Sequence, residues 1–163
     1  MFGRQKLDKK ILIIKGIGEG STALSAFDHA LCTAGIENFN LVELSSVIPK
    51  NSVIEIKEKF DLSYDVGQIQ PVVLSHTASN EKGKEISAGL GWALADEGGV
   101  FIEISGCFGE NECIGKIESS LKDMIARRSW KWDGKINKCT STTIVKEKFS
   151  SVLVCAVYTF SKL

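Results

Sequence analysis

The chain has 163 residues, and its 20 lysine and arginine residues balance its 20 aspartate and glutamate residues. With 44% hydrophobic and 25% charged residues it has an ordinary globular composition, and its length suits one domain, residues 1–163. The zero formal net charge argues against broad attraction to nucleic acid or an anionic membrane, and no apolar run is long enough to span a bilayer. The N-terminal residues lack the apolar core of a signal peptide, and the five cysteines form no CxxC pair. We therefore expect a cytoplasmic protein without a metal site or a disulfide framework.

Apolar periodicity predicts strands alternating with two helices. In chain order we expect strands at 10–15, 40–44, 68–75, 85–94, 100–104, 140–145 and 151–160, and helices at 21–34 and 112–128. Residues 85–94 are rich in alanine but alternate large and small side chains with two interior glycines, which favours a strand. Two amphipathic helices among several strands predict an α+β fold, a layered αββα sandwich of mostly antiparallel or mixed sheets covered by the helices.

A glycine-rich stretch, 16–20, separates the first predicted strand from the first predicted helix. Loop amides at a helix N-terminus can bind phosphate, but the spacing matches neither dinucleotide-binding nor P-loop patterns. The carboxylate of Glu19 would also repel a phosphate. We interpret this stretch as a flexible turn that leads into the helix, capped by Ser21 or Thr22.

A pair of serines, Ser45 and Ser46, follows the second predicted strand and precedes Pro49. A strained bond between two serines can rearrange: the second hydroxyl attacks the preceding carbonyl, and the acyl group moves from nitrogen to oxygen. β-Elimination of the ester then leaves dehydroalanine, and its hydrolysis gives an N-terminal pyruvoyl group. The reaction needs a donor for the oxyanion, and the amide of Asn40 has suitable chemistry.

The sequence resembles the pyruvoyl-dependent arginine decarboxylases. The resemblance rests on residues 18–22 (GEGST), 26–31 (AFDHAL), 34–41 (AGIENFNL) and 45–49 (SSVIP), followed by the acidic strand 101–104 (FIEI). It covers most of the chain and is densest over its first third.

The resemblance implies that the chain cuts itself between Ser45 and Ser46. Residues 1–45 would form the small β chain, and residues 46–163 the large α chain with a pyruvoyl group made from Ser46. That group would bind L-arginine through a Schiff base and release carbon dioxide and agmatine, without pyridoxal phosphate or a metal. The product would serve polyamine biosynthesis or acid resistance.

Three further site residues carry over by their positions in these motifs. Asn40 matches the asparagine that assists processing, Glu103 the proposed proton donor to the substrate carbon, and Asp28 the aspartate that binds the guanidinium group. The resemblance also implies homotrimers or dimers of trimers, with active sites between subunits. Without the resemblance each residue has an ordinary explanation: a solvated helix residue for Asp28, an outward-facing strand residue for Glu103, and a turn residue for Asn40.

Two alternatives stay open. The same chemistry on another amino acid would use Asp28 for a different cationic group, and an uncleaved homologue would serve as a subunit or binding module. The chain also departs from the family pattern at Lys50, where a second proline is common, and at Glu43, which places a negative charge near the serine pair.

Overall fold

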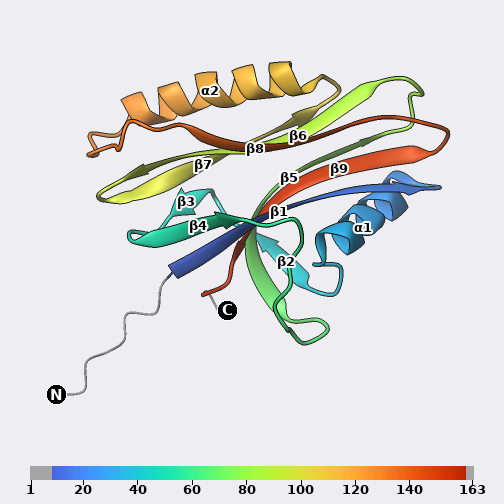
Figure 1. The fold of residues 1–163 in the computed structure, drawn as a ribbon, viewed down its shortest axis with the longest axis horizontal. Coiled ribbons are helices and arrows are strands. Elements are labelled where there is room, and N and C mark those ends of the chain that lie inside the picture. The colour runs from blue at the N-terminus through green and yellow to red at the C-terminus, as the bar shows by residue number, and fades with distance from the viewer. Residues whose placement is uncertain (1–8, 161–163) are drawn as a thin grey trace.

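The computed structural model describes residues 9–160, which form four layers (Figure 1). Helix α2 lies above one sheet, helix α1 lies below the other, and the two sheets pack face to face between them (Figure 1). The elements in chain order are β1 (Lys9–Gly20), α1 (Ala23–Ala34), β2 (Asn40–Glu43), β3 (Val47–Ile48), β4 (Ser52–Ile56), β5 (Ile69–Ser79), β6 (Glu85–Ala95), β7 (Gly98–Gly106), α2 (Glu110–Ala126), β8 (Asn137–Ile144) and β9 (Phe149–Tyr158). The predicted α+β sandwich is confirmed.

The strands form a five-stranded sheet in the order β2-β5-β9-β1-β4 and a four-stranded sheet in the order β3-β7-β6-β8. The edge strands β2 and β4 run parallel to their neighbours, whereas the other pairings are antiparallel. The strands β2 and β3 are consecutive in the chain but belong to different sheets. The short segment between them therefore crosses from one sheet to the other.

Apolar side chains fill each of the three spaces between the layers. The space between the two sheets holds side chains such as Ile13, Leu90, Phe101 and Val154, while separate apolar clusters lie under α1 and under α2. Strand β9 is buried along both faces, so it reads as a continuous apolar run rather than an alternating one.

The glycine-rich stretch is not a turn, and that prediction was wrong. Strand β1 continues through Gly20, and Gly16, Gly18 and Gly20 all face α1. A Cβ on Gly18 would lie 2.3 Å from the main-chain nitrogen of Ala30 and 2.5 Å from the main-chain oxygen of Ala26. The alternating glycines therefore let the helix approach the strand closely.

We expect Gly18→Ala to destabilise the protein by about 2 kcal/mol, because the added methyl group meets main-chain atoms of α1 that cannot rotate away. The matched control is Gly115→Ala, at an exposed position in α2 where the added Cβ meets nothing within 4 Å. That change should stabilise the protein by about 0.5–1 kcal/mol through helix propensity. Denaturant unfolding measures both, and a neutral Gly18→Ala would contradict this packing.

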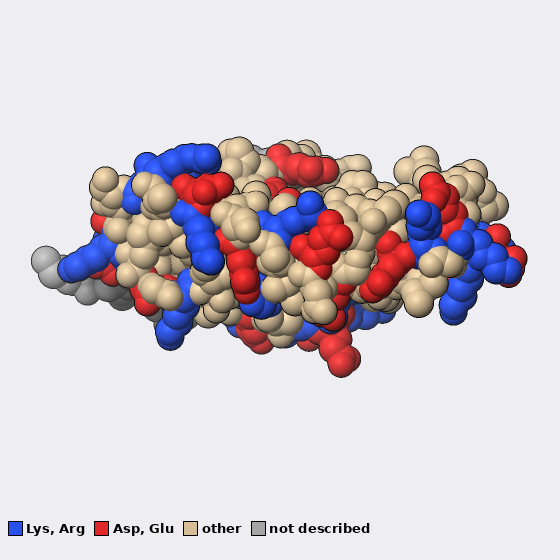
Figure 2. Space-filling view, turned by 90° about the horizontal axis from the view of Figure 1, so that it is seen from above, with Lys and Arg blue, Asp and Glu red and all other residues tan. Residues whose placement is uncertain are grey.

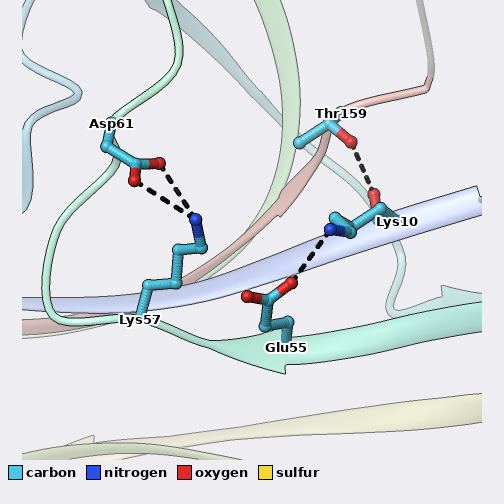
Figure 3. Close-up of polar contacts among 5 residues, drawn as sticks. All are labelled: Lys10, Glu55, Lys57, Asp61 and Thr159. Carbon is cyan, nitrogen blue, oxygen red and sulfur yellow. Dashed lines mark hydrogen bonds and ion pairs between the residues drawn. The ribbon is translucent and has the colours of Figure 1, made fainter.

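The sequence patterns also missed the two short strands β3 and β4. Strand β4 is held at the sheet edge by main-chain bonds to β1 and by an ion pair of 3.0 Å between Lys10 and Glu55 (Figure 3). Thr159 donates to the main-chain oxygen of Lys10 at 2.8 Å, and Lys57 pairs with Asp61 just beyond β4 (Figure 3). The pairing with β1 and the ion pair of Glu55 hold β4, which follows the serine pair, at the edge of the sheet.

The face seen in Figure 2 mixes basic and acidic side chains, and neither sign forms a continuous patch there. Within residues 9–160, neither helix is long and apolar enough to cross a membrane.

Candidate active site

The crossover between the sheets places Ser46 at their junction. On one side, the main-chain nitrogen of Leu44 donates to the oxygen of Val72 in β5 at 2.8 Å. On the other side, the nitrogen of Phe101 in β7 donates to the oxygen of Ser46, also at 2.8 Å. The bond between Ser45 and Ser46 therefore lies in a segment held by both sheets.

The backbone of Ser46 is strained. Its φ angle is 68°, in the left-handed region, and Asn51 (φ 63°) is the other non-glycine residue with positive φ among residues 9–160. Asparagine tolerates this conformation, whereas serine enters it at a cost of about 1–2 kcal/mol. Such strain persists only where the surrounding structure holds it, and it gathers at sites where chemistry occurs.

The hydroxyl of Ser46 contacts Glu103. Its Oγ donates to Oε1 of Glu103 at 2.5 Å, across 57 residues of sequence. Glu103 shares a strand face with Phe101, whose side chain is buried between the sheets. Glu103 is thus half-buried and faces the space between the sheets rather than the solvent.

The environment raises the pKa of Glu103. Burial is the main cause, because it penalises the charged form, and the negative charge of Glu43 adds a smaller effect in the same direction. Hydrogen bonds from Ser46 and from the main chain partly offset it. The carboxyl group therefore keeps its proton to higher pH than an exposed glutamate, as a proton donor requires.

Asn40 lies away from this pair. It begins β2, and its Nδ2 donates to the main-chain oxygen of Gly67 at 2.9 Å. A strand rises about 3.3 Å per residue, so β2 alone carries the chain about 10 Å from Asn40 to Glu43, and Ser46 lies beyond. Within one protomer the structure does not bring Asn40 to Ser46.

Asp28 lies exposed on α1. It lines an open hollow of about 550 Å³ together with residues such as Leu24, Phe27 and Leu31. The lining combines one carboxylate with three apolar side chains and the hydroxyl residues Thr22 and Ser25, a combination that suits a long aliphatic side chain ending in a cation. Ser46 and Glu103 are not part of its lining.

Tyr158 was missed from the sequence. Its hydroxyl donates to the main-chain oxygen of Val47 at 2.9 Å, next to the serine pair. The available signal was a tyrosine that closes the otherwise apolar strand β9, because a buried phenol needs a polar partner.

The histidines do not form a catalytic or metal-binding cluster. His29 bonds through Nδ1 to the main chain of Glu19, and the ring of His76 lies 4.4 Å from that of Phe27. In the part of the chain that the structure describes, no group of three or more histidine, cysteine, aspartate or glutamate side chains is placed to hold a metal ion.

The chain is similar to known proteins over nearly its whole length. A family model described as pyruvoyl-dependent arginine decarboxylase matches residues 10–163. The pyruvoyl-dependent arginine decarboxylase of Pyrococcus furiosus is 36% identical over 151 residues, which cover 91% of this chain and 94% of that protein. The proteins of the same name from Pyrococcus horikoshii (35%, covering 93% and 95%) and Thermococcus kodakarensis (35%, covering 91% and 94%) are similar to the same extent. The matched region contains Ser46, Glu103 and the strands that position them.

Proposed function

Because the chain belongs to the pyruvoyl-dependent arginine decarboxylase family, we propose that it converts L-arginine to agmatine and carbon dioxide with a pyruvoyl group of its own making. The group arises by cleavage between Ser45 and Ser46, which leaves residues 1–45 and 46–163 as two chains of one folded domain. The observation that carries this proposal is the strained backbone of Ser46 together with the hydrogen bond that its hydroxyl donates to the carboxyl group of Glu103.

Self-cleavage begins with attack of Ser46 Oγ on the carbonyl carbon of Ser45. The new C–O bond replaces the C–N bond, and Glu103 is positioned to take the proton that Oγ gives up. The left-handed φ of Ser46 favours the reaction because breaking the peptide bond releases the strain. The hydrogen bond from Phe101 to the oxygen of Ser46 keeps residue 46 in place afterwards.

Once formed, the pyruvoyl group would supply the electron sink for the loss of carbon dioxide from the substrate's α-carbon. Glu103 returns a proton to that carbon. The raised pKa of Glu103 supports this role, because its carboxyl group must hold a proton before the substrate carbon can receive one.

The substrate's guanidinium group binds Asp28. The guanidinium is planar and permanently charged, so one carboxylate can bind it through two parallel hydrogen bonds. The apolar side chains around Asp28, Leu24 among them, would cover the methylene groups of arginine.

We expect Asp28→Asn to raise the KM for arginine about 10- to 100-fold, because the amide loses the charge that pairs with the guanidinium. Cleavage of the precursor should proceed at the wild-type rate, since the proposed self-cleavage uses Ser46 and Glu103 and needs no carboxylate at position 28. Steady-state kinetics on fully cleaved enzyme measure the first effect, and gel analysis of maturation measures the second. An unchanged KM would remove Asp28 from the substrate site.

The active site forms between subunits of a homotrimer, or of a dimer of trimers. Asp28 and Asn40 lie apart from Ser46 within one protomer, so they act on the Ser46 of a neighbouring copy. Exposed apolar side chains lie next to both Asp28 and Ser46 and support this arrangement. Leu24 beside Asp28 is 76% exposed, and Val47 beside Ser46 is 52% exposed. Assembly would cover both. The five free cysteines suit a reducing compartment, and we place the enzyme in the cytoplasm.

Denaturing mass spectrometry tests the proposal directly. Cleavage should give two fragments that divide after Ser45, the larger one blocked by a carbonyl group. Carbon dioxide release from a panel of amino acids then identifies the substrate, with arginine expected to react fastest. A chain that stays intact under all conditions would instead be a non-catalytic homologue, and release from another amino acid alone would reassign the substrate.

A further inference from the structure

Tyr158 links the two sheets at the proposed cleavage site. It ends β9 in the five-stranded sheet, and its hydroxyl donates to the oxygen of Val47, in β3 of the four-stranded sheet, at 2.9 Å. The side chain is buried, with 2% of its surface exposed, and its ring packs against Phe101 and Phe160. The ring thus has a fixed place, and the hydroxyl has a defined acceptor.

The main chain around Ser46 is consequently held at two neighbouring carbonyl groups. Phe101 donates to the oxygen of Ser46, and Tyr158 donates to the oxygen of Val47. The left-handed φ of Ser46 lies at this point. A backbone conformation that costs energy needs contacts on both sides to persist. These two bonds hold the chain after the serine pair, and the bond from Leu44 to Val72 holds it before the pair.

The phenol of Tyr158 also keeps the proton that it donates to the oxygen of Val47. Burial, and to a smaller extent the negative charge of Glu103, raise the pKa of Tyr158 above its ordinary value. The hydroxyl therefore stays protonated over the pH range in which the carboxyl group of Glu103 titrates. The contacts of Tyr158 with the oxygen of Val47 and with the ring of Phe101 place it beside the residues that follow Ser46 and precede Glu103.

We infer that Tyr158 is a positioning residue for the reaction at residue 46, acting through the Val47 carbonyl to hold Ser46 against Glu103. The inference rests on the proposed self-cleavage. Loss of the Tyr158 hydroxyl should affect both stages of maturation, the attack on the Ser45 carbonyl and the later breakdown of the ester. Attack on the Ser45 carbonyl slows, because Oγ is less often in position.

The ester that follows has two possible fates. Elimination removes the Cα proton of residue 46, breaks the Cβ–O bond and releases the Ser45 carboxylate; water then displaces ammonia to leave the pyruvoyl ketone. Hydrolysis instead adds water across the ester and returns a free serine at position 46. When residue 46 is poorly held, elimination slows and hydrolysis of the ester competes better with it. The share of large chains that begin with serine therefore rises.

The test compares Tyr158→Phe with Tyr64→Phe, which removes the hydroxyl of the chain's only other tyrosine. Tyr64 donates to the oxygen of Gly35 at 3.2 Å, remote from Ser46, so it controls for the loss of a half-buried hydroxyl. A time course by denaturing mass spectrometry reports the rate of cleavage and the ratio of the two large chains, the pyruvoyl form being lighter by one ammonia. We expect Tyr158→Phe to mature about tenfold more slowly and with more serine-terminated chain, and Tyr64→Phe to mature like the wild type.

A third variant, Phe160→Leu, separates positioning from packing. It loosens the ring of Tyr158 but keeps the hydroxyl, so it should lose stability while retaining the wild-type ratio of products. Equal maturation of Tyr158→Phe and wild type, or an equal defect in Phe160→Leu, would overturn the inference. A wild-type chain that never cleaves would overturn the proposed function itself, so the two failures are distinguishable.

Discussion

A Ser46→Ala chain is expected to remain intact and to release no carbon dioxide from arginine. The substitution removes the oxygen that attacks the Ser45 carbonyl, and the contact with Glu103 disappears with it. We expect maturation to fall by more than about a thousandfold, which denaturing mass spectrometry after prolonged incubation would show as a single species. Activity falls equally, because the pyruvoyl group is never formed.

Two companion variants isolate the cause. Ser45→Ala keeps the carbonyl that is attacked and should still cleave, so the two serines are not equivalent. Ser46→Gly also stays intact, but it relieves the left-handed φ and should be about 1 kcal/mol more stable than Ser46→Ala. Cleavage of Ser46→Ala at this bond would exclude the hydroxyl of Ser46 as the nucleophile.

Sequence patterns predicted the long elements of this fold because each is governed by the burial of a face. Helix α2 and strand β9 are the clearest cases, since their apolar residues recur at helical spacing or run continuously. Strands β3 and β4 were not predicted, because a strand of two to five residues is too short to show a periodic apolar pattern. Their pairing depends on β7 and β1, which lie far away in the sequence.

The misinterpreted glycines show why a local rule can fail. Glycine is common in turns, which favours a loop at Gly16, Gly18 and Gly20, but their spacing of two is the period of a strand. Ala26 and Ala30 recur at helical spacing on the facing helix, and both are fully buried. Small residues at matching periods on a strand and a helix thus predict close packing between them.

The candidate site was only partly accessible from the sequence. The resemblance supplied the proposed roles of Ser46 and Glu103. The face of Glu103 could not be read from alternation, because β7 packs against α2 on one face and against the other sheet on its other face. The contact of Ser46 with Glu103 follows from β3 pairing with β7. The proposed contributions of Asp28 and Asn40 depend on the proposed assembly, which periodicity within one chain does not encode.

Glu103→Gln is expected to reduce turnover by about 10²- to 10⁴-fold and to slow cleavage by a smaller factor. The amide oxygen can still accept the hydrogen bond from Ser46, but the amide neither takes the proton of Oγ nor gives one to the substrate carbon. In the wild type, cleavage uses the carboxylate and should slow as the pH falls through the pKa of Glu103. The proposed turnover uses the protonated acid and should be lost as the pH rises through the pKa of Glu103 in the cleaved enzyme, where the hydroxyl of Ser46 no longer lowers it.

The rate of cleavage and the rate of turnover thus depend on pH in opposite directions. We call these two dependences the limbs, and they give the prediction its control. Glu43→Gln removes a negative charge that helps to raise the pKa of Glu103, so both limbs should move to lower pH while the maximal rates stay near those of the wild type. Glu103→Gln should instead abolish both limbs, leaving slow cleavage that does not vary with pH across this range. Rates of maturation and of carbon dioxide release measured over the same pH series decide the matter. If the limbs persist in Glu103→Gln, the titrating group is another residue, and the raised pKa of Glu103 reflects only its burial between the sheets.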